Sequence, residues 1–197
     1  MLSNHLQDVE MEPFFELDAF YHRDVYFVYS EQNEQPYIDS FTKPLNGVTP
    51  LYYEVDVLDE AITQYDILPT IGLPLVSSLF VEQFRAVSDK EVQFIPAEIR
   101  DNSGDFNHQF YAMKVLKRFA CIDMNRSQIS YRRYGECQSL QIQTLVIDAS
   151  KVEGASIFSL QEKLAYIIVN QTIRDLCQPL RGVECLPLVE AFGSRFW

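Results

Sequence analysis

Four carboxylate side chains stand close together in the first third of the sequence and form its densest group of residues that could do chemistry. They follow Tyr52 in the segment YYEVDVLDE, as Glu54, Asp56, Asp59 and Glu60. Alternation along this segment places Glu54 and Asp56 on one face of a strand, where two carboxylate oxygens could hold Mg²⁺ or Ca²⁺. The glycine-containing loop of a calcium site does not surround them, so we favour a solvated acidic surface over a metal site.

Residues for nucleophilic or nucleotide chemistry are sparse. The histidines are His5, His22 and His108, and neither the serine motif G-x-S-x-G nor a glycine-rich phosphate loop occurs in the sequence. The sequence leaves open a pairing of Cys121 with His108, although isolated Cys and His residues usually serve packing or solvent contact. We therefore expect a protein that is not an enzyme, with no catalytic residue, no metal and no cofactor.

The cysteines and the first residues of the chain predict its compartment. Cys121, Cys137, Cys177 and Cys185 form no C-x-x-C pair, so we expect reduced, buried thiols. The segment MLSNHLQDVEMEPFFELDAF carries carboxylates where a signal peptide would be apolar. No stretch approaches the roughly 20 apolar residues that span a bilayer. These features predict a cytoplasmic protein.

The net charge of −12 is concentrated in one part of the chain. Residues 1–66 hold 14 acidic side chains against two basic ones, Arg23 and Lys43, whereas residues 67–197 hold 14 of each. Six Lys and Arg side chains between 114 and 133 face only Asp123. An acidic surface repels nucleic acid and anionic membranes, so we expect neither as a ligand, and a basic protein is the charged partner that it favours. The alternative is that the acidity only confers solubility.

Periodicity indicates the elements that must position these groups. The segment 24–30 is aromatic and β-branched and predicts a strand, and 51–57 predicts a half-buried strand that leads through Asp59 and Glu60 into a helical turn. Strand composition returns at 109–116 and 139–148, with a basic, turn-containing segment between them. Strands outnumber long helices without regular β–α alternation, which predicts an α+β fold with a mixed or mostly antiparallel sheet and a few short helices.

Two stretches of the sequence repeat one pattern. Residues 76–96, VSSLFVEQFRAVSDKEVQFIP, and residues 169–187, VNQTIRDLCQPLRGVECLP, align with a gap of two residues when the first and last residues of each are paired. Each copy predicts a short strand, a capped amphipathic helix, a turn and a second strand. We expect an internal duplication of this strand–helix–strand module, against the alternative of chance similarity between two amphipathic helices.

The helix of each copy has a candidate cap and an apolar stripe. In the first copy Ser77 or Ser78 precedes Phe80, Phe84 and Val87, which recur at helical spacing. In the second copy the cap is Asn170, and the stripe comprises Ile173, Leu176, Cys177 and Leu180. Each stripe needs a sheet to cover it.

A series of mostly apolar words runs from about Asp66 to Glu190: YDILPTIGLPLVSSLFVEQF, VQFIPAEI, QFYAMKVL, CIDMNRS, IFSL, AYIIVNQTIRDL and RGVECLP. This order resembles immunity protein family forty-three, formerly a domain of unknown function, of bacterial polymorphic toxin systems. The resemblance marks polar or special positions that look like caps, turns and core anchors: Asp66, Pro74, Ser77, Asp123, Ser127, Phe158 and Gly182. The chain departs from the family at Lys114, where the family often has Asn.

The resemblance implies a bacterial, cytoplasmic protein that binds and neutralises a cognate toxin without chemistry of its own. Many such toxins act on nucleic acid and have basic surfaces, which an acidic inhibitor can cover. We predict that the partner-binding residues are Tyr52, Glu54, Asp56, Asp59 and Glu60, and the alternative is an ordinary solvated strand edge.

The resemblance also divides the chain. We expect an acidic N-terminal segment, 1–65, packed against a family-like α+β domain, 66–197, in one compact unit. Two other classes of function stay open. One is a self-associating structural or scaffold protein, which would form a homo-oligomer. The other is a hydrolase or transferase that uses His108, Asp123 or Cys121.

Overall fold

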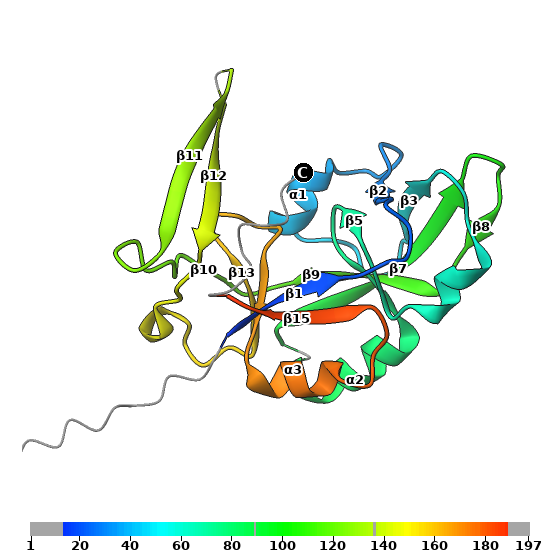
Figure 1. Ribbon diagram of the computed structural model, residues 1–197. Helices are drawn as coiled ribbons and strands as arrows, with labels where there is room; N and C mark the ends of the chain where they lie inside the picture. Colours follow the sequence, from blue (N-terminus) through cyan, green and yellow to red (C-terminus); the bar gives the residue numbers. More distant parts are fainter. Residues whose placement is uncertain (1–13, 89, 136, 189–197) are drawn as a thin grey trace, which may run out of the picture.

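The computed structural model describes residues 14–88, 90–135 and 137–188, which form two β-sheets, a projecting hairpin and a few short helices (Figure 1). Residues 1–13 of the acidic segment 1–65, including His5, thus lie outside the described residues. The helices are α1 (Tyr37–Thr42), α2 (Ser78–Ser88) and α3 (Gln171–Cys177), with the 3-10 turns η1 (Glu60–Gln64) and η2 (Ala149–Lys151). The predicted α+β class with a mixed sheet is confirmed, and strands dominate it.

The larger sheet curls into an almost closed barrel. Its strands follow in spatial order as β4 (Ile67–Leu68), β6 (Leu75–Ser77), β9 (Phe110–Val115), β7 (Val92–Asp101), β3 (Leu51–Val55), β2 (Phe27–Tyr29) and β5 (Thr70–Ile71), and β8 (Phe106–Asn107) pairs with β7. The edge strands β4 and β5 are consecutive in the chain with only Pro69 between them, so the sheet returns on itself. Pro69 has no N–H to donate, and its carbonyl accepts from the Phe27 amide at 2.9 Å.

Apolar side chains from the barrel strands fill its interior. Phe27, Tyr53, Leu75 and Ile99 belong to one buried cluster there. Close packing in this interior also explains a glycine: Gly72 has φ +136°, and a Cβ at this position would lie 2.9 Å from the Tyr29 Cβ. The barrel wall is therefore tightly set around Tyr29.

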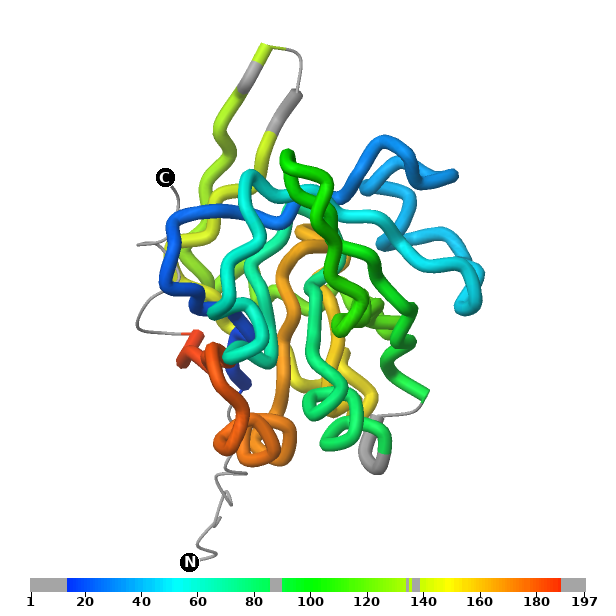
Figure 2. Tube along the Cα trace, turned by 90° about the vertical axis from the view of Figure 1, so that its right-hand side faces the viewer, coloured from blue at the N-terminus to red at the C-terminus, as the bar shows by residue number. Residues whose placement is uncertain are grey.

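The smaller sheet covers the two helices. Its order is β10 (Arg118–Phe119), β13 (Ile157–Leu160), β14 (Ile167–Val169), β1 (Phe15–Ala19) and β15 (Val183–Pro187). Figures 1 and 2 both place α2 and α3 side by side at one end of the molecule. Their apolar stripes meet both sheets in a core that includes Phe80, Phe84, Val169 and Ile173. The predicted amphipathic helices therefore bury the faces that the sequence indicated.

The two predicted caps are present. The Ser77 hydroxyl accepts from the Phe80 amide at 3.2 Å, and Asn170 Oδ1 accepts from the Ile173 amide at 3.1 Å. Each oxygen satisfies a first-turn N–H that has no partner within its helix. The Val87 side chain, predicted in the first stripe, lies outside the described residues.

The repeated sequence has a structural counterpart. In both copies, β6–α2–β7 and β14–α3–β15, two parallel strands flank one strand that is antiparallel to each of them, β9 in the first copy and β1 in the second. The registers match at the ends of the copies: Val76 and Pro96 both pair with Tyr111, and Val169 and Pro187 both pair with Phe15. The duplication itself remains a prediction.

A two-stranded hairpin projects from the body of the protein (Figure 1). It consists of β11 (Gln128–Tyr134) and β12 (Cys137–Thr144), which pair with each other from Tyr134↔Cys137 to Gln128↔Thr144. The basic segment before residue 139 contains turns at 124–126 and 135, as predicted, but the strand β11 within it was not predicted. The strand predicted over 139–148 starts and ends earlier. Towards the outer end of this hairpin, residues 130–133 are all exposed, so β11 tolerates Arg132 and Arg133, and charge alone does not indicate a turn.

Candidate partner-binding site

The outer surface of β3 carries three of the five predicted site residues. Leu51, Tyr53 and Val55 point into the barrel and are buried, whereas Tyr52 is half-buried and Glu54 and Asp56 are exposed on the opposite side. The predicted alternation is confirmed up to the end of the strand. The prediction that the half-buried strand continues to residue 57 was wrong. Val57 is 54% exposed, because the strand ends at Val55.

A transverse row of side chains crosses this outer surface. Glu54 pairs with Val28 on one side and with Arg100 on the other, Val28 also pairs with Ile71, and Arg100 also pairs with Phe106. Val28, Ile71 and Phe106 are exposed by 40%, 46% and 60%. Large apolar side chains next to charged ones on an open sheet face are typical of a surface that meets another protein.

Two of the predicted carboxylates are engaged within the chain. Arg23 Nη2 donates to both oxygens of Asp56, at 2.8 and 2.6 Å, and Arg23 Nη1 donates to Asp59 at 3.0 Å. Hydrogen bonds from the Val57 amide and from Arg23 lower the pKa of Asp56. Burial alone would raise the pKa of Asp59, but hydrogen bonds from Tyr21 and Arg23 hold it below its ordinary value. Both carboxylates are therefore charged, but Arg23 offsets much of their field.

Asp59 has a further local role, because its carboxylate caps η1. Its Oδ1 accepts from the Ala61 amide at 2.9 Å, as expected for the predicted helical turn. Glu60 is exposed at the first position of this turn. The structure thus brings Tyr52, Glu54 and Asp56 onto one face and sets Asp59 and Glu60 beyond its end.

The loop after β2 supplies acidic residues that the sequence analysis did not select. Glu31 and Glu34 are exposed in this loop, in the segment EQNEQP. The charge pattern of that segment could have indicated them. Glu34 forms no ion pair within the described part of the chain. These two carboxylates add to the negative charge beside Tyr52 and Glu54.

Asn33 fixes the loop against β3. Its Nδ2 donates to the carbonyls of Ser30 and Tyr52, at 2.9 and 2.8 Å, and its Oδ1 accepts from the Tyr52 amide at 2.9 Å. The Ser30 hydroxyl donates to the Glu54 carboxylate at 2.5 Å. Asn33 therefore takes the place of a neighbouring strand at Tyr52, so the loop and the outer face of β3 form one rigid surface.

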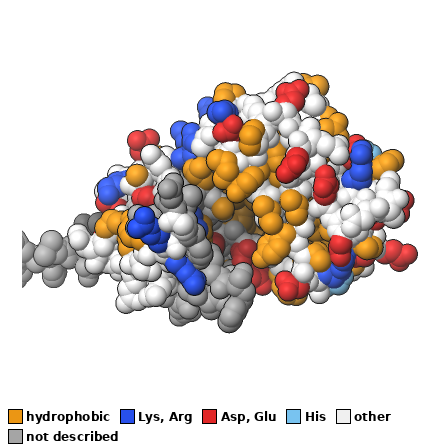
Figure 3. All heavy atoms as spheres, turned by 90° about the horizontal axis from the view of Figure 1, so that it is seen from above, with side chains coloured by type: hydrophobic (Ala, Val, Ile, Leu, Met, Phe, Trp, Pro, Cys, Tyr) orange, Lys and Arg blue, Asp and Glu red, His pale blue; other side chains and the backbone are white. Residues whose placement is uncertain are grey.

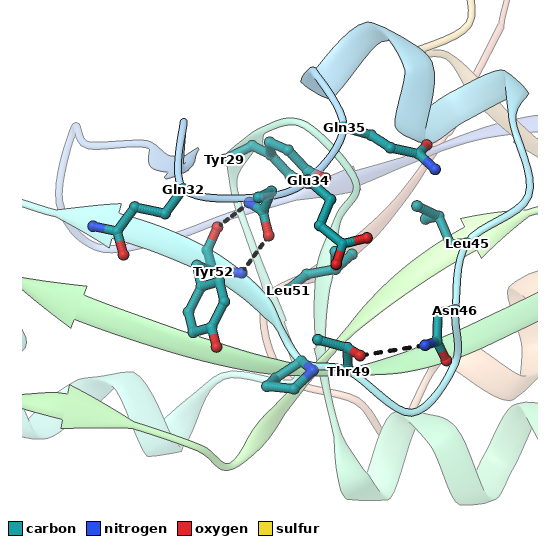
Figure 4. A pocket seen from close by; sticks show the side chains of 11 residues that line it. Tyr29, Gln32, Glu34, Gln35, Leu45, Asn46, Thr49, Leu51 and Tyr52 are labelled. Carbon is teal, nitrogen blue, oxygen red and sulfur yellow. Dashed lines mark hydrogen bonds between the residues drawn. The ribbon is translucent and has the colours of Figure 1, made fainter.

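A pocket of about 260 Å³ lies between this loop and the segment before β3. Figure 4 shows its lining from Tyr29, Glu34 and Gln35 on one side to Leu45 and Leu51 on the other, with the Glu34 carboxylate pointing into the space between the two leucines. Tyr29 is only 6% exposed, yet its hydroxyl has no hydrogen-bond partner among the described residues, and neither has Gln35 Oε1. Buried polar atoms without partners are uncommon and call for an explanation.

Lys114, the position at which the chain departs from the family pattern, holds the helix behind this pocket. It is 5% exposed, and its ammonium donates to the Ser40 carbonyl at 2.6 Å and to the Lys43 carbonyl. These carbonyls belong to the last turn of α1 and its C-cap, where a cation is favourable. Burial, with a smaller effect of Arg118, lowers the pKa of Lys114. Lys114 is thus a structural residue that anchors α1 to β9.

The residues proposed for hydrolytic chemistry lie in other settings. Burial raises the pKa of the Cys121 thiol to about 12, with a further contribution from Glu162, so the thiolate is disfavoured at neutral pH. His108 lies on the barrel exterior with its Nδ1 3.7 Å from a Glu98 oxygen. Asp123 accepts the amides of Asn125 and Arg126 within a turn. Cys121, Cys177 and Cys185 are free thiols. Cys121 and Cys177 are buried as predicted, whereas Cys185 is only half-buried, and the Cys137 side chain lies outside the described residues.

The described ranges contain no group of three or more His, Cys, Asp or Glu side chains that could hold a metal ion. None of the described helices is long and apolar enough to cross a membrane.

The fold defines a β-rich protein of two sheets, in which the exposed outer side of β3 adjoins the acidic loop after β2. Comparison with known families identifies it further. Residues 42–189 match the model of an immunity protein family, Imm11, and the chain belongs to this family. The match confirms the resemblance to an immunity protein family but does not confirm the number forty-three. A comparison with curated proteins found no match.

The family match includes all five predicted site residues, because it begins at residue 42, upstream of Asp66. Several positions that the resemblance had marked are structural. Asp66 is buried and accepts from the Ser77 hydroxyl at 2.6 Å and from the Arg181 amide at 2.8 Å, which ties the first module to the turn of the second. The next residue, Gly182, has φ +76°, and a Cβ there would meet the Phe20 carbonyl at 2.7 Å. The expected caps and turns are thus present at these positions.

Proposed function

We propose that this protein neutralises a cognate bacterial toxin by covering it with one surface, here called the front face. The front face comprises the outer sides of β2 and β3, the adjoining row to Ile71 and Phe106, and the loop 30–36. The observation that supports this choice is the row Ile71, Val28, Glu54, Arg100 and Phe106, where exposed apolar side chains flank a carboxylate. Membership of an immunity protein family supports the toxin as the partner.

The charge of the front face favours a basic partner. In Figure 3, Asp and Glu side chains are scattered over the right half of the view, where Figure 1 places β2, β3 and β8, among hydrophobic side chains that border a hollow near the centre. Because Arg23 pairs with Asp56 and Asp59, we assign most of the attraction to Glu31, Glu34 and Glu54. An uncompensated field of one sign speeds association with a basic partner and weakens with added salt.

Inhibition of this kind requires no covalent step in the immunity protein. A preformed surface excludes water from the toxin's own site and places hydrogen-bond acceptors against the basic side chains of the toxin. The bonds of Asn33 and Ser30 keep the loop and β3 in one arrangement before the toxin arrives. Binding then costs little ordering entropy, which favours a tight complex.

The test uses the secreted toxin whose gene adjoins the gene for this chain. Cells that express the toxin should survive when the intact chain is present, and the double variant Glu34→Lys with Glu54→Lys should no longer protect them. The matched control is Glu82→Lys on α2, an exposed glutamate at the opposite end of the molecule, which should protect fully. Equal protection by all three proteins would exclude the front face, and death with the intact chain would exclude this toxin as its partner.

A further inference from the structure

We infer that Cys177 and Cys185 form a thiol pair that hydrogen peroxide oxidises to a disulfide within the chain. This inference goes beyond the proposed function and does not depend on it. Cys177 is the last residue of α3, and Cys185 lies in the middle of β15, which follows α3 after a short turn. Both are free thiols, so the structure shows the reduced form of the pair.

The pairing of β15 with β1 places Cys185 on the sheet face that α3 covers. Cys185 pairs with Leu17, and residues that pair on neighbouring strands project to the same face of a sheet. Leu17 belongs with Cys177 to the buried cluster between the helices and the sheets, and Cys185 packs against this cluster. α3 and β15 contact each other, and Figure 1 shows them next to each other. The two cysteines therefore approach from the helix and from the sheet.

The two thiols meet between these elements, where a hydrogen bond joins their side chains. Sulfur atoms in such contact are farther apart than the roughly 2.05 Å of a disulfide bond, but small side-chain rotations can close the remaining gap. The turn between the elements is ordered by the Leu180 amide, which donates to the Cys177 carbonyl at 3.0 Å, and by Gly182 with its φ of +76°. The fold thus holds the two sulfur atoms together before any oxidant arrives.

The two sulfur atoms differ in exposure and in charge. Cys177 is buried whereas Cys185 is half-buried, so a small oxidant reaches Cys185 first. The hydrogen bond from Cys177 and the charge of Arg174 lower the pKa of Cys185, although burial opposes them. Arg174 is held in place by Phe15, since its guanidinium carbon lies 4.3 Å from the centre of that ring. Cys185 is therefore the attacking thiolate, and Cys177 is the thiol that completes the disulfide.

The oxidation consumes one peroxide molecule for each pair. The Cys185 thiolate attacks one peroxide oxygen, so that an S–O bond forms, the O–O bond breaks, and the departing hydroxide takes up a proton as water. Cys177 sulfur then attacks Cys185 sulfur, the S–S bond forms, and the S–O bond breaks. The hydroxide released in this second step leaves as water with the proton of the Cys177 thiol. Two thiols thus lose two electrons and two protons, and peroxide is reduced to two water molecules.

Cys121 is the matched control within the same chain. It is also a free thiol, but it is fully buried in a different cluster, among residues such as Ile122 and Phe158. Its pKa of about 12 keeps it protonated at neutral pH, and the thiolate is the form that reacts. We expect Cys121 to stay reduced under conditions that oxidise the pair.

The experiment treats the reduced full chain with hydrogen peroxide and locates the oxidised cysteines by mass spectrometry of its peptides. Every protein carries Cys137→Ser, so that the thiols under test are the three that the structure describes. We expect the chain to lose the mass of two hydrogen atoms and to yield a peptide linked through Cys177 and Cys185. Cys177→Ala should leave Cys185 as a sulfenic acid that dimedone traps. Cys185→Ala should slow oxidation of Cys177 at least about tenfold, and Cys121→Ala should form the link as before.

The inference is overturned if the intact chain forms no link between Cys177 and Cys185, or if Cys121 is oxidised as fast as the pair. A Cys177→Ala variant that folds, as circular dichroism reports, but gives no trapped sulfenic acid at Cys185 would also overturn it. The linked peptide of the intact chain decides the inference even where a variant fails to fold. None of these results involves the toxin, so the proposed function stands or falls separately.

Discussion

Tyr29 and Tyr53 give a paired test of the unpartnered hydroxyl. The two residues pair across β2 and β3, and their rings meet edge to face with centroids 5.6 Å apart. Tyr53 is fully buried and donates to the Leu73 carbonyl at 2.9 Å, whereas the Tyr29 hydroxyl has no partner in the described chain. The substitution of Phe removes one oxygen from either site, so any difference between the two variants reports the hydrogen bond.

The two substitutions should have effects of opposite sign. A buried polar group without a partner costs about 1–3 kcal/mol. We take the lower end and expect Tyr29→Phe to raise the free energy of unfolding by about 1 kcal/mol, or Tm by roughly 2–4 °C. Tyr53→Phe leaves the Leu73 carbonyl unpaired and should lower the free energy of unfolding by about 1–3 kcal/mol.

Urea unfolding followed by circular dichroism measures both changes, and equal slopes against urea show that the denatured state is unchanged. Tyr29→Phe should therefore unfold at a higher urea concentration than the intact chain, and Tyr53→Phe at a lower one. A loss of stability in Tyr29→Phe as large as that in Tyr53→Phe would refute the reasoning, since it would mean that the Tyr29 hydroxyl is already satisfied.

Three further outcomes test how the surface is held in place. Lys114→Met should lower the free energy of unfolding by about 2–4 kcal/mol in urea titrations, because two carbonyls at the end of α1 lose their donor; an unchanged midpoint would contradict the anchoring role. Asn33→Ala should cost about 1–2 kcal/mol and weaken toxin binding about tenfold in calorimetry, since the loop loses three hydrogen bonds. Hydrogen bonds from Ser103 and the Leu58 amide lower the pKa of Asp101 from its ordinary 3.8 to about 2, so the unfolded chain binds more protons in that range. The stability that Asp101 contributes should be complete above pH 3.8 and fall as the pH drops towards 2. If the free energy of unfolding falls no more steeply with pH in the intact chain than in Asp101→Asn, the carboxylate contributes nothing.

The local signals of the sequence predicted the helices and most strands. Ser77 and Asn170 cap their helices because a side-chain oxygen before an apolar stripe satisfies first-turn amides regardless of tertiary context. Alternation identified β3 for a similar reason, since one face of this strand meets the barrel interior and the other meets water. Such patterns are short-range and can be read from a single sequence.

Long-range pairing could not be predicted in the same way. Nothing in FELDA indicates that β1 inserts between β14 and β15, because its burial depends on partners at 167–169 and 183–187. Closure of the barrel through Pro69 likewise depends on the curvature of the whole sheet. Neither feature could be expected from the sequence alone.

In the candidate site, too, the local pattern could be predicted and the long-range contacts could not. The alternation of Tyr52, Glu54 and Asp56 was predicted, but the pairing of Arg23 with Asp56 and Asp59 joins residues more than 30 positions apart. That pairing moves the effective negative charge from the predicted cluster towards Glu31 and Glu34. The pocket was also unpredictable, because Asn33 ties the loop that lines it to β3 through bonds that only the folded chain brings together.

The most direct test of the central claim is a hydrogen-exchange comparison of the free chain with its toxin complex. The account predicts that binding slows exchange at the amides of residues 27–36 and 51–56, which form the front face, and leaves α2 and α3 unchanged. Protection confined to those helices or to the hairpin β11–β12, with the front face as open as in the free chain, would contradict it.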